Sequence, residues 1–101
     1  MFQPLIERPH PALGGVQKLY RFPNGYGASV VQFNFMGAHS YGGDQGLWEL
    51  AVTKFNGPRE DDWEIACDTP ITEDVLGWLT DDDVDAKLAE IRALPTPSDA
   101  A

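Results

Sequence analysis

The densest group of potentially reactive side chains in the 101-residue sequence is a run of carboxylates near its C-terminal end. Carboxylate oxygens are the ligands that hard cations such as Ca²⁺ prefer. The spacing does not fit an EF-hand loop, because Ala86 stands where that loop needs glycine and Arg92 where it needs a bidentate glutamate. We therefore expect no metal here and treat the run as a candidate interaction face, made up of Asp81, Asp82, Asp83 and Asp85.

Residue types for zinc binding or nucleophilic catalysis are present but scattered. Zinc needs several Cys or His ligands, and the chain offers only Cys67, His10 and His39, without ligand spacing. Cys67 alternates with Trp63 and Ile65, which indicates a small buried residue rather than a reactive thiolate. We therefore expect no metal, no cofactor and no catalysis, and interpret the protein as a non-enzyme.

A glycine-rich segment over 37–46 is the second candidate for recognition. It lacks the GKS or GKT of a phosphate-binding loop. Loops held by a rigid scaffold often carry binding residues, so we interpret the segment as a candidate recognition loop with His39, Tyr41, Asp44 and Gln45. The alternative is a hairpin connection that is long enough to need its glycines.

Strand-like segments must position these groups. Runs of β-branched and aromatic residues predict strands over 16–22, 27–36, 47–55 and 63–67. Short turns between the runs indicate an antiparallel meander. The residues expected to face the core are Val31, Phe33 and Phe35 in the second strand and Trp48, Leu50 and Val52 in the third.

The first two strands flank Pro23-Asn24-Gly25, a strong hairpin signal because glycine and asparagine tolerate positive φ. Two registers fit the sequence. A two-residue turn pairs Phe22 with Gly27, whereas a type I turn led by Pro23, with Gly25 in a bulge, pairs Phe22 with Tyr26.

Helical spacing replaces the strand pattern in the C-terminal third. Thr72 is a plausible cap for a short helical turn over 73–79, which Gly77 weakens. Thr80 and Asp83 resemble a capping box, with Asp in place of Glu, at the start of a clearer helix. The apolar side of that helix recurs at helical spacing as Val84, Leu88, Ile91 and Leu94, with Pro95 beyond its end.

These elements together predict an α+β fold, in which a single antiparallel sheet of about four strands packs against a C-terminal amphipathic helix. The length favours one domain, over 16–95. Residues 1–15 are interpreted as an extended Pro-rich arm, because proline cannot donate the amide hydrogen bond that a central strand requires. Residues 96–101 are interpreted as a disordered tail.

The charge is strongly polarised along the chain. Residues 57–101 carry thirteen acids and three cations, within a formal net charge of −9 for the whole sequence. This balance disfavours direct nucleic-acid binding, while the single cysteine and the absence of a long apolar run indicate a cytoplasmic protein without a membrane span. The acidic half is either a solvated surface or a face for a basic partner, including a nucleic-acid mimic.

The second face of the predicted sheet leaves apolar residues without an obvious cover. Leu19, Val30 and Leu47 fall on this face. Monomers seldom expose a large apolar patch, so this face and the Pro-rich arm together indicate a homodimer.

Three strings in a fixed order carry a resemblance to a known group. They are YRFPNGYGASVV at Tyr20–Val31, GLWELAV at Gly46–Val52 and DTPITEDVLGWLT at Asp68–Thr80. The chain resembles small uncharacterised proteins encoded by actinobacterial phages, from which it departs in its longer N-terminus and at Phe33–His39. The resemblance implies a phage accessory protein in the bacterial cytoplasm, and we expect a non-enzymatic module that binds a host or phage protein. The alternatives are a self-assembling structural or virion-associated module and an acidic nucleic-acid mimic.

Overall fold

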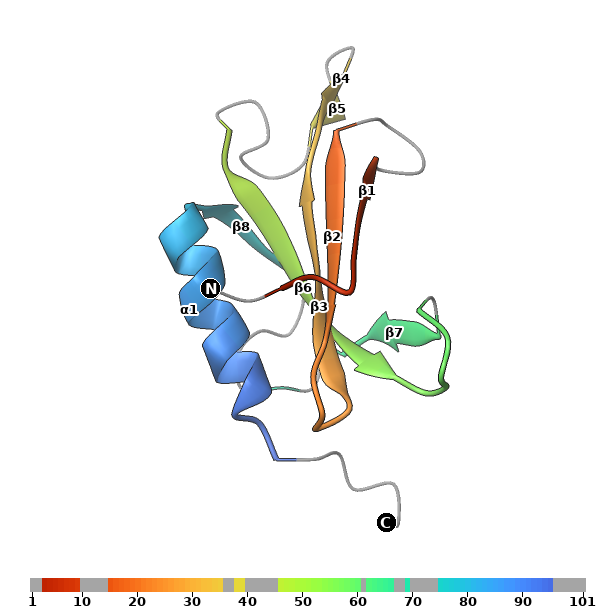
Figure 1. Cartoon of the computed structure of the whole chain (residues 1–101). Coiled ribbons are helices and arrows are strands. Elements are labelled where there is room, and N and C mark those ends of the chain that lie inside the picture. The colour runs from red at the N-terminus through yellow and green to blue at the C-terminus, as the bar shows by residue number, and fades with distance from the viewer. Residues whose placement is uncertain are drawn as a thin grey trace.

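One helix packs on one face of an antiparallel sheet in the computed structural model, which describes residues 3–9, 15–35, 38–39, 46–60, 62–66, 69 and 75–95 (Figure 1). The strands are β1 (Ile6–Pro9), β2 (Val16–Arg21), β3 (Tyr26–Gln32), β4 (Asn34–Phe35), β5 (Ala38–His39), β6 (Trp48–Phe55), β7 (Trp63–Ile65) and β8 (Val75–Leu79), and the helix is α1 (Asp81–Arg92). The α+β class and the C-terminal helix are therefore confirmed.

The sheet contains more strands than the sequence predicts. Within the described residues it has six, in the order β1-β2-β3-β6-β7 with β8 also paired to β6, and β4-β5 form a separate hairpin. The segment interpreted as an extended arm contributes β1, which pairs antiparallel with β2. Pro9 is tolerated because β1 lies at the edge of the sheet, where only alternate amide groups point toward the neighbouring strand.

The predicted helical turn over 73–79 is wrong, because Val75–Leu79 is β8. β7 pairs with the second half of β6 and β8 pairs with its first half, so both lie along the same edge of β6. Without β8, the edge of β6 near Leu50 would lack partners for its backbone amide and carbonyl groups. The hydrogen bonds gained by pairing with β6 outweigh the local helical preference of this segment. Trp78 takes a positive φ of 54° within the strand.

The β2–β3 hairpin adopts the second of the two predicted registers. Phe22 N–H donates to the Tyr26 carbonyl at 2.8 Å, and Gly25 N–H donates to the Phe22 carbonyl at 3.1 Å. Gly25 has a φ of 90°, which suits a type I turn followed by a bulge. The choice of register fixes which side chains of β2 and β3 share a face.

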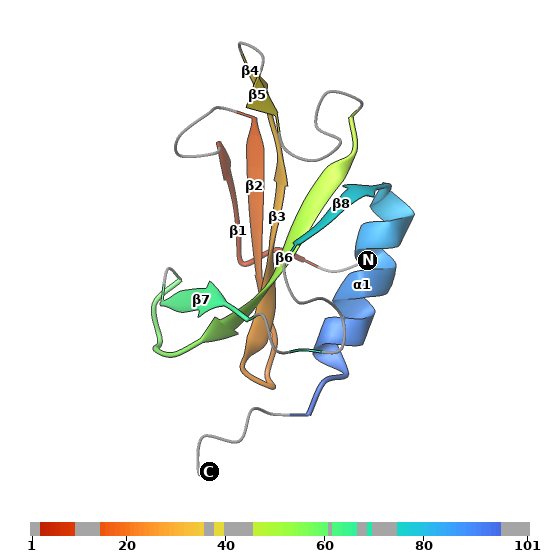
Figure 2. The ribbon, with the colours of Figure 1, turned by 180° about the vertical axis from the view of Figure 1, so that it is seen from behind.

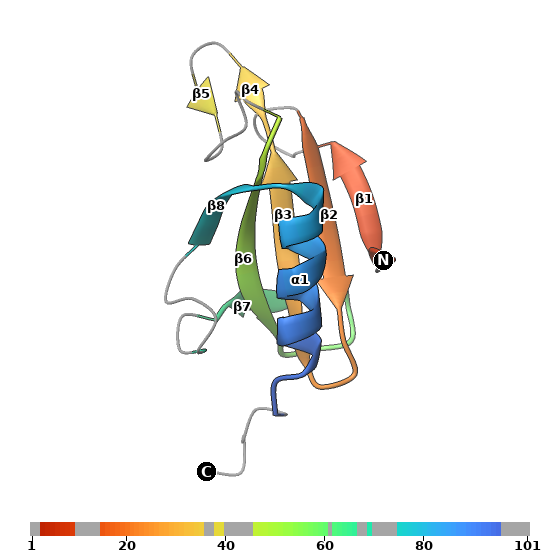
Figure 3. The ribbon, with the colours of Figure 1, turned by 90° about the vertical axis from the view of Figure 1, so that its left-hand side faces the viewer.

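The core lies between the sheet and α1, which lies in front of β3 and β2 and runs roughly along them (Figure 3). Leu50 and Val52 face α1 as expected, and Trp48 packs against the same core. The face predicted for β3 is wrong, because Ala28 and Val30 face the helix. The buried residues of this core are Tyr20, Phe22, Ala28, Val30, Leu50, Val52, Ala66, Val84, Leu88 and Ile91.

The sheet face away from α1 is also largely buried, which explains the error for β3. Val31 is only 8% exposed although it is outside the core under α1, so hydrophobic alternation in β3 carried little information. Leu19, expected on an exposed face, is fully buried there and pairs with Ile6 of β1. β7 and the end of β6 also turn to the side opposite α1 (Figure 2).

Candidate functional site

The carboxylates of the candidate interaction face lie in the first turns of α1 but differ in their environments. Asp81, Asp82 and Asp83 are exposed, whereas Asp85 is half-buried. The four therefore do not act as one equivalent cluster, and each has to be placed by its own contacts.

Asp83 belongs to the structure of the helix end. Its N–H donates to the Thr80 hydroxyl and its carboxylate accepts the Thr80 N–H, each at 3.1 Å, which completes the predicted capping box. The hydrogen bond from the Thr80 backbone is the main cause that holds the pKa of Asp83 below its ordinary value, followed by the bond with the Thr80 side chain. Asp83 is thus kept ionised to stabilise α1.

Asp81 ties the start of α1 to the sheet. The Trp48 indole Nε1–H donates to Asp81 Oδ1 at 2.7 Å, a bond between β6 and α1 that spans 33 residues of sequence. A charged acceptor makes this bond stronger than one between neutral groups. It fixes both the indole ring and the first turn of the helix.

A cavity of about 390 Å³ lies between this end of α1 and strands β1 and β2. Val30 and Val84 contribute apolar surface to it, and Gln3 and Pro4 line it from the N-terminal side. The polar and aromatic residues that line it come from four elements: Glu7, Lys18, Tyr20, Trp48, Asp81 and Asp85. We call this the α1–β2 groove.

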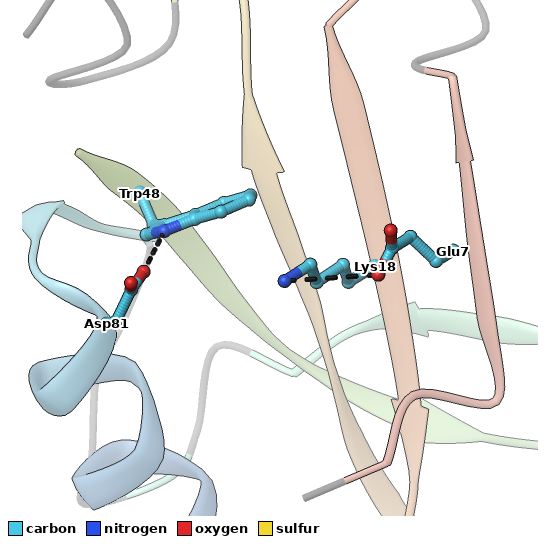
Figure 4. A network of polar contacts seen from close by, with 4 residues as sticks. All are labelled: Glu7, Lys18, Trp48 and Asp81. Carbon is cyan, nitrogen blue, oxygen red and sulfur yellow. Dashed lines mark hydrogen bonds and ion pairs between the residues drawn. The ribbon is translucent and has the colours of Figure 1, made fainter. Parts of the chain in front are cut away.

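A chain of polar contacts crosses the α1–β2 groove from β1 to α1 (Figure 4). The Lys18 ammonium lies 4.0 Å from a Glu7 carboxylate oxygen and 4.7 Å from the centroid of the Trp48 ring. The distance to the ring is typical of a cation–π contact. Trp48 therefore receives a cation on its face and donates its N–H to Asp81.

Tyr20 lines the groove beside these groups and is only 5% exposed. Burial is the main cause that raises the pKa of its hydroxyl, and the negative charges of Asp85 and Glu7 raise it further. Its hydroxyl is therefore neutral at physiological pH and lies within the influence of two groove carboxylates.

The charges of the groove do not cancel. Three carboxylates, those of Glu7, Asp81 and Asp85, line it together with one ammonium, that of Lys18. Aromatic rings and carboxylates around a concave site are the combination that recognises organic cations. Among the described residues, no group of three or more His, Cys, Asp or Glu side chains is arranged to hold a metal ion.

The candidate recognition loop is mostly outside the described residues. This applies to Tyr41, Asp44 and Gln45, as it does to Cys67. The backbone of His39 pairs with Asn34 in the β4–β5 hairpin.

Sequence reasoning missed the groove residues contributed by the sheet. Glu7 was assigned to the arm, and Trp48 was expected only to face the core. Lys18 carried a usable signal, because it shares its face of β2 with the apolar Tyr20 and Phe22. A lysine on an otherwise buried face of a strand needs a partner, and here Glu7 and Trp48 supply one.

No protein-family model matches the sequence, and neither the curated proteins nor the solved structures contain a match to it. In the part of the chain that the structure describes, no helix is long and apolar enough to cross a membrane.

Proposed function

We propose that the protein is a non-enzymatic interaction module that binds a basic protein partner through the α1–β2 groove and the acidic first turns of α1. The observation that carries this proposal is the charge of the groove, where three carboxylates from two separate elements, β1 and α1, meet one ammonium. Asp82 extends the same negative surface outward, because it is exposed in the turn that also carries Asp81.

The arrangement favours specific binding over a solvated surface. Asp81 is fixed by Trp48, and the capping box fixes the turn that carries it. Charges held in place bind with a smaller entropic cost than charges on mobile side chains. The resemblance to phage-encoded proteins extends the proposal to a host factor in the bacterial cytoplasm. Nucleic-acid mimicry is a special case of this proposal, in which the basic partner is itself a nucleic-acid-binding protein.

A fluorescent oligoarginine peptide, titrated in an anisotropy assay at low and moderate salt, tests the proposal. Neutralising the proposed surface with Asp82→Asn and Asp85→Asn is expected to weaken binding about tenfold, since each ion pair with the peptide contributes up to about 1 kcal/mol. The matched control is Glu60→Gln with Glu64→Gln, which removes the same charge from two other exposed acids. Equal weakening by both double variants contradicts the proposal, because the peptide would then respond only to net charge.

Self-assembly is the second candidate, and it has an observation of its own. Among the residues that the structure describes, three large apolar side chains are exposed, with Trp78 56%, Ile65 48% and Leu5 48% accessible. Trp78 and Ile65 belong to β8 and β7, which both pair with the same edge of β6. A solution mass above that of one chain, reduced by Trp78→Ser, would support this function. A monomeric mass at the highest soluble concentration would contradict it.

A further inference from the structure

We propose that the α1–β2 groove is a pocket for the guanidinium of a single arginine side chain, and that Lys18 occupies the Trp48 face as an internal cation until that arginine binds. This inference rests on the proposed function and names the chemical group that the groove recognises.

The Lys18–Trp48 contact shows that the groove already favours a cation at its aromatic wall. Lys18 Nζ lies 4.7 Å from the ring centroid, and the lysine side chain is 29% exposed. The indole cannot turn away easily, because its N–H is held by Asp81 at 2.7 Å. A second cation on this ring would find the plane already oriented.

The groove keeps a net negative charge after the Lys18 ammonium is counted, so it can accept one more cation. Glu7 is the carboxylate nearest to Lys18, at 4.0 Å, and can keep the ammonium when it leaves the ring. Asp81 and Asp85 then face the cavity from α1 without a cation of the sheet between them. One added guanidinium would reduce the excess negative charge of the groove from two to one.

Tyr20 offers a ligand in the groove one further polar group. The residue is only 5% exposed and lines the cavity. Its hydroxyl is neutral at physiological pH, because burial, followed by the charges of Asp85 and Glu7, raises its pKa. The hydroxyl oxygen can therefore accept a hydrogen bond from an N–H of a bound guanidinium.

Arginine fits these groups better than lysine does. A guanidinium is planar, stacks on an aromatic face and presents five N–H donors, whereas an ammonium is a compact point charge with three. The groove offers a flat ring in Trp48, carboxylate acceptors in Asp81 and Asp85, and a hydroxyl in Tyr20. Its volume of about 390 Å³ exceeds the lower limit of ordinary ligand pockets, roughly 300 Å³.

The test is an NMR titration that follows the Trp48 indole N–H signal while single-residue amides are added. The probes are the acetylated amides of arginine, lysine and citrulline, the last being the neutral counterpart of arginine. We expect a saturable shift with arginine, binding at least about fivefold weaker with lysine, and no shift with citrulline. Equal affinity for lysine and arginine, or an equal shift with magnesium chloride, overturns the proposal.

Two pairs of variants separate the pocket from general electrostatics. Asp85→Asn should weaken arginine binding about fivefold or more, and Glu64→Gln, with the same charge change on β7, should not. Lys18→Met should tighten binding about fivefold because it removes the competing cation, whereas Lys54→Met at the far end of β6 should change it little. Unchanged binding in Lys18→Met overturns the role assigned to Lys18.

The proposed function and the pocket can fail separately. If oligoarginine still binds in a manner that requires Asp82 and Asp85 while arginine amide leaves the Trp48 signal unmoved, the basic-partner function stands and the pocket is refuted. If neither probe binds, both are refuted.

Discussion

Asn24 joins the tip of the β2–β3 hairpin to the end of α1, and we expect Asn24→Ala to destabilise the whole domain. Its amide nitrogen lies 2.9 Å from the Ile91 carbonyl oxygen, 3.1 Å from that of Arg92 and 3.0 Å from that of Leu94. Its side-chain oxygen accepts the Tyr26 N–H at 3.0 Å. The last carbonyl groups of a helix have no partner within the helix, so Asn24 acts as a C-terminal cap from a distant part of the chain.

The expected loss follows from the number of bonds that can form at once. An amide group has two N–H donors, so at most two of the three carbonyl groups are fully bonded at any moment. With the Tyr26 bond this gives three hydrogen bonds, each with a net contribution of about 1 kcal/mol. Water can replace some of them at this partly exposed end. We therefore expect Asn24→Ala to lower the free energy of unfolding by about 2 kcal/mol.

Asn24→Asp separates the cap from the turn that contains it. The aspartate can still accept the Tyr26 N–H, but it places a negative oxygen against the carbonyl groups at the negative end of the α1 dipole. At neutral pH we expect a loss at least as large as that of Asn24→Ala. Because protonation removes the repulsion, the difference from the parent protein should shrink near pH 4, close to the ordinary pKa of aspartate.

Urea unfolding followed by tryptophan fluorescence measures these differences. Asn56→Ala is the matched control, because it removes the same amide from the other Asn-Gly pair of the chain, at an exposed position. The control should change the free energy of unfolding by less than about 0.5 kcal/mol. Equal losses in Asn24→Ala and Asn56→Ala would refute the role of Asn24 as the clamp on α1.

Three further changes test other contacts. Gly27→Ala should destabilise the protein by about 2 kcal/mol or more in urea unfolding, because a Cβ there would overlap the Tyr20 carbonyl oxygen. Thr80→Ala should cost about 1 kcal/mol at neutral pH. Since the pKa of Asp83 is lowered on folding, the stability from its ionised form is present above its ordinary value of 3.8 and is lost as the pH falls through the folded value, so the parent protein and Thr80→Ala should converge in acid. The Tyr20 hydroxyl, with its raised pKa, should ionise above its ordinary value of 10.0 in an absorbance titration at 295 nm, and its contribution to stability should fall as the pH rises above 10.0, which Tyr20→Phe should abolish.

The helix was predictable because its signals are local. Thr80 and Asp83 lie within one turn, and Val84, Leu88 and Ile91 repeat at the spacing of a single helix face. Each signal involves residues that are neighbours in both sequence and structure, so no knowledge of the sheet was needed.

β8 was not predictable in the same way, since its cause is distant in sequence. Residues Val75–Leu79 form a strand because they pair with Trp48, Leu50 and Ala51 of β6. A local reading gave weight to Thr72 and the acids that follow it, which favour a helix start. Strand pairing is decided by an open edge elsewhere in the fold, and tertiary context overrides local preference in such segments.

Only the helical side of the α1–β2 groove could be predicted from the sequence. The acids at its helical side were identified, because they are consecutive. Its sheet side depends on the pairing of Glu7 with Lys18 and of Lys18 with Val30. The first pair belongs to a strand that the sequence did not predict, and the second to a hairpin whose register the sequence left open. The predicted acidic face therefore named Asp81 and Asp85 but could not place a cation and an aromatic ring opposite them.

The width of the groove is set by contacts at both ends of α1. Trp48 holds the first turn through Asp81, and Asn24 holds the last carbonyl groups, while Leu88 is fully buried between them. A helix fixed at both ends and in its middle cannot move away from β2 without breaking long-range bonds. A ligand would therefore meet carboxylates and a ring already in position, with little ordering cost left to oppose binding. It follows that Asn24→Ala, although remote from the groove, should also weaken the binding of arginine amide, and unchanged binding in that variant would show that Trp48 and the core alone keep α1 in place.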